Sequence, residues 1–202
     1  MAVPDEVASP APNIAIADPA PLGLAGFALT TFLISVVNAG WLPLAGGSIW
    51  LGMAMFYGGA AQFCAGMWSF RRGATFPAVA FSSYGAFWMG LAIIFFVTPV
   101  TTMALGKAPN DALAWFFFAW GVFTLYMTVA ALRTNVAVLG VFVFLTLTYL
   151  FLWLGAWQNN GNLTNIGGYL GIVTAAVAWY AAMAGVVNAT WGRIVFPEFP
   201  LT

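Results

Sequence analysis

Residues 134–157 read TNVAVLGVFVFLTLTYLFLWLGAW, 24 consecutive residues without a charged side chain. A helix rises about 1.5 Å per residue, so this segment is long enough to cross a hydrocarbon core about 30 Å thick. Lipid offers the backbone no hydrogen-bond partners, and a helix satisfies its own backbone groups within one segment. The segment therefore predicts a transmembrane helix.

Five further runs of 21 to 24 residues also lack charged side chains: 22–42, 48–70, 75–98, 112–132 and 164–187. Hydrophobic residues make up 63% of the chain and charged residues 5%, against about 45–50% and about 25% in globular proteins. We predict an all-α integral membrane protein with six transmembrane helices. These helices form a domain over residues 22–190, between an extended N-terminal tail (1–21) and a short C-terminal tail (191–202).

The few basic residues are distributed unevenly between the predicted connections. When both termini are placed in the cytoplasm, only Lys107 lies on the opposite face. The other four lie in cytoplasmic connections: Arg71, Arg72, Arg133 and Arg193. This satisfies the positive-inside rule. We therefore predict a multi-pass protein of the cell membrane, plasma or inner, with cytoplasmic N and C termini.

Two local signals set the expected boundaries of the helices. Asp18 is a favoured N-cap residue and Pro19 suits the first helical position, so we expect the first helix to begin there. The stretch 98–110 contains Pro99 and Pro109 and is expected to be the longest loop between helices.

The chain lacks the side chains that catalysis or metal binding needs. It contains no His, and its single cysteine, Cys64, has no second thiol to pair with. The acidic residues lie in tails, loops or helix ends: Asp5, Glu6, Asp18, Asp111 and Glu198. Triad and metal chemistry therefore lack the groups they need. We predict no enzyme activity, no metal, no cofactor and no nucleic-acid partner.

Polar side chains inside the predicted helices are grouped rather than scattered. Phe27, Thr31, Ser35 and Asn38 are spaced by four, four and three residues and so share one face of a helix. Other helices contribute further polar or aromatic candidates: Gln62, Ser83, Trp88 and Thr146. Such groups either bond to neighbouring helices and their own backbone or line a narrow central conduit for a small polar solute.

The last predicted helix carries a continuous stripe of small residues: Gly171, Ala175, Ala178, Ala182 and Gly185. A stripe of this kind lets another helix backbone approach closely. The partner is either another helix of the same chain or a neighbouring subunit.

The opening motif is similar to a known family signature. The segment Asp18-Pro19-Ala20-Pro21-Leu22-Gly23, followed by Gly26-Phe27 and Thr30-Thr31, resembles that of the acetate uptake transporter (AceTr) family. Parts of 56–66, 75–88 and 120–125 are also similar, so the resemblance covers nearly the whole chain. One departure is that Asp18 stands where the family usually has Asn. A negative charge at a mouth meant for anions would repel them unless it is screened.

The resemblance implies a six-helix protomer assembled as a homo-hexamer in the lipid bilayer, each protomer with its own path. It also implies a hydrophobic constriction formed by Phe27, Tyr84 and Leu145. The function implied is transport of acetate and similar short monocarboxylates, and of succinate, either coupled to protons or as an anion channel. A passive channel for small neutral solutes such as urea is the alternative, because a slot lined by aromatic rings and hydroxyls also suits an amide.

The energetics of an apolar constriction bear on the charge of the solute. Burying a bare carboxylate costs several kcal/mol even after relaxation. Protonating a carboxyl whose pKa is about 4.3 costs about 3.7 kcal/mol at pH 7. We therefore hypothesise that the solute crosses neutral, or as an anion sharing a proton, with Thr31, Tyr84 and Gln62 bonding to the carboxyl group.

Overall fold

The computed structural model describes residues 16–43, 49–105 and 110–201. Residues 1–15 of the predicted N-terminal tail and Lys107 lie outside the described residues. The helical elements, in chain order, are α1 (Ala20–Asn38), α2 (Ile49–Met55), the π-helical segment η1 (Phe56–Ala61), α3 (Gln62–Arg71), α4 (Thr75–Leu105), α5 (Asn110–Ala131), α6 (Val136–Trp157) and α7 (Gly161–Trp191).

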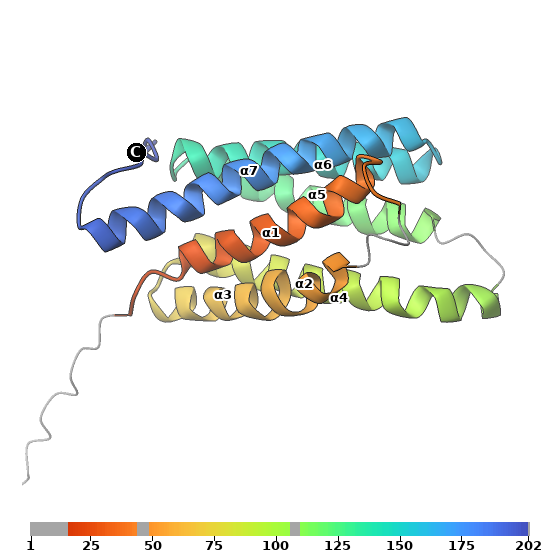
Figure 1. Cartoon of the computed structure of the whole chain (residues 1–202), viewed down its shortest axis with the longest axis horizontal. Helices are drawn as coiled ribbons and strands as arrows, with labels where there is room; N and C mark the ends of the chain where they lie inside the picture. Colours follow the sequence, from red (N-terminus) through yellow and green to blue (C-terminus); the bar gives the residue numbers. More distant parts are fainter. Residues whose placement is uncertain (1–15, 44–48, 106–109, 202) are drawn as a thin grey trace, which may run out of the picture.

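The helices lie lengthwise beside one another in an elongated bundle (Figure 1). α1 packs along α7, α7 along α6, and α6 along α5, whereas α3 packs along α4. Among the described residues five helices are long and apolar enough to cross a membrane: α1, α4 over Thr75–Val97, α5 over Asp111–Ala131, α6 and α7. The predicted all-helical membrane fold is confirmed at this level.

The remaining predicted segment, 48–70, coincides with three elements that follow one another without a break. α2, η1 and α3 together cover residues 49–71 as one helical rod. The π-helical turns divide this rod, so that none of its parts alone has the length of a span. π-Helical turns arise where an extra residue is accommodated inside an α-helix, frequently at functional sites.

Several helix boundaries differ from those predicted. α4 continues to Leu105 through Pro99, where the sequence predicted a loop from residue 98. A proline removes only one backbone donor, and helices of membrane proteins tolerate this where neighbouring groups compensate. α1 begins at Ala20 with Pro19 as its N-cap, one residue later than predicted. Asp18 still contributes, because its Oδ1 accepts a hydrogen bond of 3.2 Å from the N–H of Ala20.

The stripe of small residues on α7 packs within the chain. Gly171, Ala175, Ala178 and Ala182 are buried. A Cβ added at Gly171 would collide with Ser35 Oγ on α1, and one at Gly185 would lie 2.8 Å from Pro21. The stripe was predicted to pack against either another helix of the same chain or a neighbouring subunit. Where it meets α1, it packs against a helix of the same chain.

The C-terminal segment turns back after α7 and lies against the connection between α5 and α6. Asn188 Oδ1 accepts from the N–H groups of Val195 and Phe196, at 2.7 and 3.0 Å. The N–H of Val136 donates to the carbonyl of Phe199 at 3.0 Å. The Asn135 amide donates to Glu198 Oε2 at 2.9 Å. These bonds fix the segment at the end of the bundle where α1 begins.

Candidate solute path

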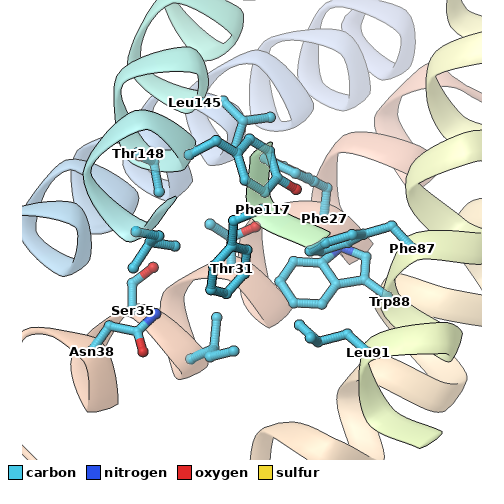
Figure 2. Close-up of a pocket in the computed structure, with 13 residues that line it drawn as sticks. Phe27, Thr31, Ser35, Asn38, Phe87, Trp88, Leu91, Phe117, Leu145 and Thr148 are labelled. Carbon is cyan, nitrogen blue, oxygen red and sulfur yellow. The ribbon is translucent and has the colours of Figure 1, made fainter. Parts of the chain in front are cut away.

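Two small cavities lie in the bundle between α1, α4 and α6. The larger, which we call the Asn38 cavity, has a volume of about 30 Å³ (Figure 2). Its lining residues are Phe27, Thr31, Ile34, Ser35, Asn38, Phe87, Trp88, Leu91, Phe117, Leu145, Thr148, Tyr149 and Leu152. The smaller, the Gln62 cavity, has a volume of about 20 Å³ and is lined by Leu24, Phe27, Gln62, Ala80, Phe81, Tyr84, Val141, Phe142 and Leu145.

Phe27 and Leu145 line both cavities and so form the wall between them. Tyr84 stands beside this wall on the side of the Gln62 cavity, with its ring centroid 5.7 Å from that of Phe27. All three side chains are buried. Each cavity has room for about one water molecule. A solute as large as acetic acid would therefore pass only after the side chains of the wall had moved.

The polar face predicted on the first helix lines the Asn38 cavity. Thr31, Ser35 and Asn38 all contribute to it, opposite Trp88 of α4 and Leu145 of α6 (Figure 2). Thr31 Oγ1 and Trp88 Nε1 are buried and have no hydrogen-bond partner among the described residues. Such groups are expensive to leave unpaired, so the cavity offers two positions at which a polar guest is stabilised.

Gln62 enters the second cavity because the rod of residues 49–71 approaches two helices very closely. A Cβ at Gly58 would collide with Thr30 of α1, and a Cβ at Gly66 would collide with Ser82 of α4. Glycine at both positions therefore allows the rod to lie between α1 and α4. Gln62 is 1% exposed, and its Oε1 has no hydrogen-bond partner in the part of the chain that the structure describes.

Two candidate residues do not line either cavity. Ser83 is half-buried, and Thr146 lies instead in an apolar groove of about 300 Å³ between α5 and α6. Successive residues of a helix point about 100° apart, so Ser83 and Thr146 diverge from their neighbours Tyr84 and Leu145. Thr148, three residues after Leu145, shares its face and lines the Asn38 cavity.

The hydroxyl of Tyr84 is engaged by a residue that the sequence analysis did not select. It lies 2.8 Å from Oγ1 of Thr124 on α5, a fully buried side chain. Its bond to Thr124 occupies one hydrogen-bonding position of this hydroxyl, and the bond from Tyr84 to the solute stays a prediction. Phe117, two helical turns before Thr124, lines the Asn38 cavity. The only feature of the sequence that indicated a role for α5 was the similarity of residues 120–125, which include Thr124, to the family.

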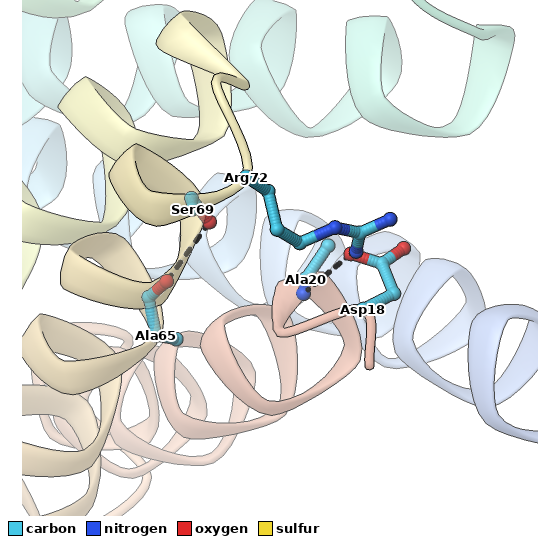
Figure 3. Close-up of polar contacts among 5 residues, drawn as sticks. All are labelled: Asp18, Ala20, Ala65, Ser69 and Arg72. Carbon is cyan, nitrogen blue, oxygen red and sulfur yellow. Dashed lines mark hydrogen bonds and ion pairs between the residues drawn. The ribbon is translucent and has the colours of Figure 1, made fainter. Parts of the chain in front are cut away.

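The opening motif packs the start of α1 against other helices. A Cβ at Gly23 would lie 2.6 Å from the ring of Phe81 on α4, and Pro19 is buried. Asp18 is exposed, and its Oδ1 lies 2.7 Å from Nη1 of Arg72 at the end of α3 (Figure 3). Asp18, which stands where the family usually has Asn, therefore adds a carboxylate whose charge is paired with the guanidinium of Arg72.

A second carboxylate lies at this end of the bundle. Partial burial raises the pKa of Glu198 above its usual value of 4.5, and the charge of nearby Asp18 raises it further. The hydrogen bond from Asn135 holds the Glu198 carboxyl group in this position.

The fold and the two cavities define a helical membrane protein whose small internal cavities, in the part of the chain that the structure describes, are lined by uncharged side chains. Within that class, the chain belongs to the GPR1/FUN34/yaaH family, whose model matches residues 2–202. It is 39% identical over 186 residues to the succinate-acetate/proton symporter SatP of Escherichia coli K12, covering 92% of this chain and 96% of that protein. It is 37% identical over 201 residues to acetate permease A of Emericella nidulans, covering 91% and 67% of the two chains.

A solved structure agrees with these sequence matches. The structure of the bacterial acetate channel SatP is similar with a TM-score of 0.84 and 39% identity, over 91% of this chain and 99% of that one. The resemblance to the acetate uptake transporter family is therefore confirmed. The relatives named here are transporters or channels by name, not enzymes.

Proposed function

We propose that this protein carries acetate and similar short carboxylic acids, with succinate as a further substrate, across the cell membrane. The observation that carries the proposal is the wall of Phe27 and Leu145 between two cavities. On one side of this wall lie the unpaired polar atoms of Thr31 and Trp88, and on the other lies Gln62. The names of the relatives supply the class of solute.

The constriction formed by Phe27, Tyr84 and Leu145 suits a short acid with a small apolar tail. A methyl group makes favourable contacts with two rings and a leucine side chain, whereas a longer chain needs a larger displacement of these side chains. Thr31, Ser35 and Asn38 bind the polar end of the solute on one side of the constriction. Gln62 binds it on the other.

The solute crosses the constriction as the neutral acid, so that uptake is coupled to protons. No residue that lines either cavity carries a formal charge, and a bare carboxylate would lose its hydration without compensation. Protonation costs about 3.7 kcal/mol at pH 7 for a carboxyl of pKa about 4.3. Gln62 Oε1 is an acceptor that suits the O–H of a carboxylic acid on one side of the wall, and Trp88 Nε1 is a donor that suits its C=O on the other.

The arrangement in the membrane follows from the same proposal. The rod of residues 49–71 acts as the sixth span, and both termini lie in the cytoplasm. The described basic residues support this orientation, because Arg71, Arg72, Arg133 and Arg193 all follow or precede turns at the end of the bundle where α1 begins (Figure 1). The protein lies in the plasma or inner membrane and assembles as a homo-hexamer, as the family resemblance implies.

Uptake of radiolabelled acetate into proteoliposomes tests this function. Because acetic acid also crosses lipid unaided, initial rates are measured after subtraction of protein-free vesicles, and unlabelled acetate is used as competitor. We expect saturable uptake that increases as the external pH is lowered. A large acetate current that does not respond to pH would support an anion channel instead, and uptake equal to that of empty vesicles would exclude acetate transport.

A passive channel for urea is the second candidate, because a lining of neutral donors and acceptors also suits an amide. Labelled urea measured in the same vesicles separates the two functions. Urea flux that exceeds acetate flux and does not respond to pH would favour the channel.

A further inference from the structure

Thr124 occupies a position in the middle of α5 that neither cavity reaches. It is 0% exposed and is absent from the residues that line the Asn38 and Gln62 cavities. Its Oγ1 donates to the carbonyl of Trp120 one turn earlier, at 2.7 Å. Since a threonine hydroxyl has one proton, the hydroxyl of Tyr84 is the donor in the 2.8 Å bond between Tyr84 and Thr124.

This chain of two bonds distinguishes Thr124 from other threonines of the bundle. Thr148, Thr174 and Thr190 also donate to the carbonyl four residues earlier, each at 2.8 Å. Such bonds are ordinary in membrane helices. Thr124 is the one among these four whose oxygen, in the structure described, also accepts a bond from an aromatic side chain at the constriction.

The ring of Tyr84 packs mainly against side chains from other helices. Phe123 of α5 lies 5.3 Å away, Phe27 of α1 5.7 Å and Trp120 of α5 5.9 Å, measured between ring centroids. These aromatic contacts limit where the ring can lie but leave its direction adjustable, because ring contacts are weakly directional. The hydrogen bond to Thr124 supplies the missing directional restraint.

We propose that Thr124 is a positioning residue that holds Tyr84 at the constriction and thereby sets the preference for the shortest acid. Thr124 acts through Tyr84 and does not touch the solute. The inference rests on the proposed transport function. If the bond is lost, the buried Tyr84 hydroxyl loses its partner on α5, and the ring can turn toward the Gln62 cavity, which it lines.

Four variants test this role: Thr124→Val, Thr124→Ser, Tyr84→Phe and the double variant Thr124→Val with Tyr84→Phe. Valine keeps the shape of threonine and removes the oxygen, whereas serine keeps the oxygen. We expect Thr124→Val to lower initial acetate uptake by about three- to tenfold, the range that corresponds to the net contribution of one hydrogen bond. We also expect it to change the ratio of acetate to propionate uptake, and we expect Thr124→Ser to stay within about twofold of the parent.

The double variant separates positioning from a general loss of stability. Tyr84→Phe removes the hydroxyl that Thr124→Val leaves without a partner. The double variant should therefore take up acetate faster than Thr124→Val and at the same rate as Tyr84→Phe alone. Ser69→Ala is the matched control, because Ser69 is a buried hydroxyl that donates to Ala65 of its own helix at 2.8 Å, away from the cavities. Uptake is normalised to protein that elutes as one folded species in detergent.

Each outcome bears on one of the two proposals. Parental uptake and selectivity in Thr124→Val, or an equally large loss when that change is added to Tyr84→Phe, would overturn the positioning role. If Thr124→Val does not fold, the ratio of acetate to propionate uptake in Tyr84→Phe decides, since removing the bond from its other end must also change selectivity. Absence of competed acetate uptake in the parent protein would instead contradict the proposed function itself.

Discussion

Asp18 Oδ1 lies 2.7 Å from Nη1 of Arg72, and this ion pair joins the residue before the N-cap of α1 to the residue after α3. The pair is exposed, so it adds little to stability, about 0–1 kcal/mol. Its larger effect is on the electrostatic potential at this end of the bundle, because the Asp18 carboxylate neutralises the charge of Arg72.

Asp18→Asn is therefore expected to increase acetate uptake from this side at low salt. Asparagine keeps an oxygen for the N–H of Ala20 but frees the charge of Arg72, which attracts anions. The KM for acetate should fall, and the difference should disappear at high ionic strength because exposed charges are screened. Arg72→Gln is the matched opposite and should raise KM. Equal KM values for the three proteins at low salt would show that this pair does not influence solute capture.

Glu198→Gln is expected to stabilise the protein at neutral pH. The folded state raises the pKa of Glu198 above 4.5, first through burial and then through Asp18. The folded state therefore binds this proton more tightly than the unfolded state. Stability from this group is complete below pH 4.5 and is lost as the pH rises through the folded-state pKa.

Glutamine retains an oxygen for the Asn135 amide and cannot ionise. The thermal midpoint in detergent should exceed that of the parent protein at pH 7, and the two should converge at about pH 4, below the unfolded pKa. A higher midpoint that is the same at both pH values would mean that the charge of Glu198 is not its cause.

The sequence predicts the helices well because hydrophobic length is a local property. The segment 134–157 corresponds to α6 over Val136–Trp157, and all six uncharged runs coincide with helical rods. The π-helical turns of η1 and the continuation of α4 through Pro99 were not predicted. The π-helical turns lie where Gly58 closely approaches Thr30 of α1, a contact that no local pattern records. The continuation of α4 shows that a proline alone does not fix the end of a membrane helix.

The sequence predicts the residues of the candidate site correctly where they follow helical spacing along one face. The prediction fails where it must choose between nearby residues of one helix. Thr31, Ser35 and Asn38 follow helical spacing and share the Asn38 cavity. Thr146 was predicted from its place next to Leu145, whereas residues three or four positions from Leu145 share its face, and Thr148 is the threonine at such a spacing. Thr124 had no pattern of its own, because its importance comes from Tyr84 on another helix.

Gly171→Ala is expected to destabilise the bundle by about 1–3 kcal/mol, because an added methyl group overpacks the contact between α7 and α1. Its Cβ would collide with Ser35 Oγ, which lines the Asn38 cavity. Gly52→Ala is the control, since a Cβ there meets nothing within 4 Å, and it should gain up to about 1 kcal/mol from helix propensity. Thermal midpoints in detergent give the comparison. Equal midpoints for the two variants would contradict close packing at Gly171.

Leu145→Ala is expected to join the two cavities and to relax selectivity for acetate. Leu145 and Phe27 are the two residues that line both cavities, so shortening the leucine side chain removes part of the wall between them. Propionate and butyrate uptake should increase relative to acetate uptake, because the longer chains gain space that acetate does not need. The variant should also lose about 2–5 kcal/mol of stability through the cavity it creates.

Leu147→Ala is the matched control for this change. Leu147 lies on the same helix but is 37% exposed and lines neither cavity, so its truncation should leave the ratio of the three uptake rates unchanged. Competed initial rates for the three labelled acids in proteoliposomes, per amount of folded protein, provide the measurement. If folded Leu145→Ala keeps the parental ratio, the solute does not pass between Phe27 and Leu145, and the path lies elsewhere in the bundle.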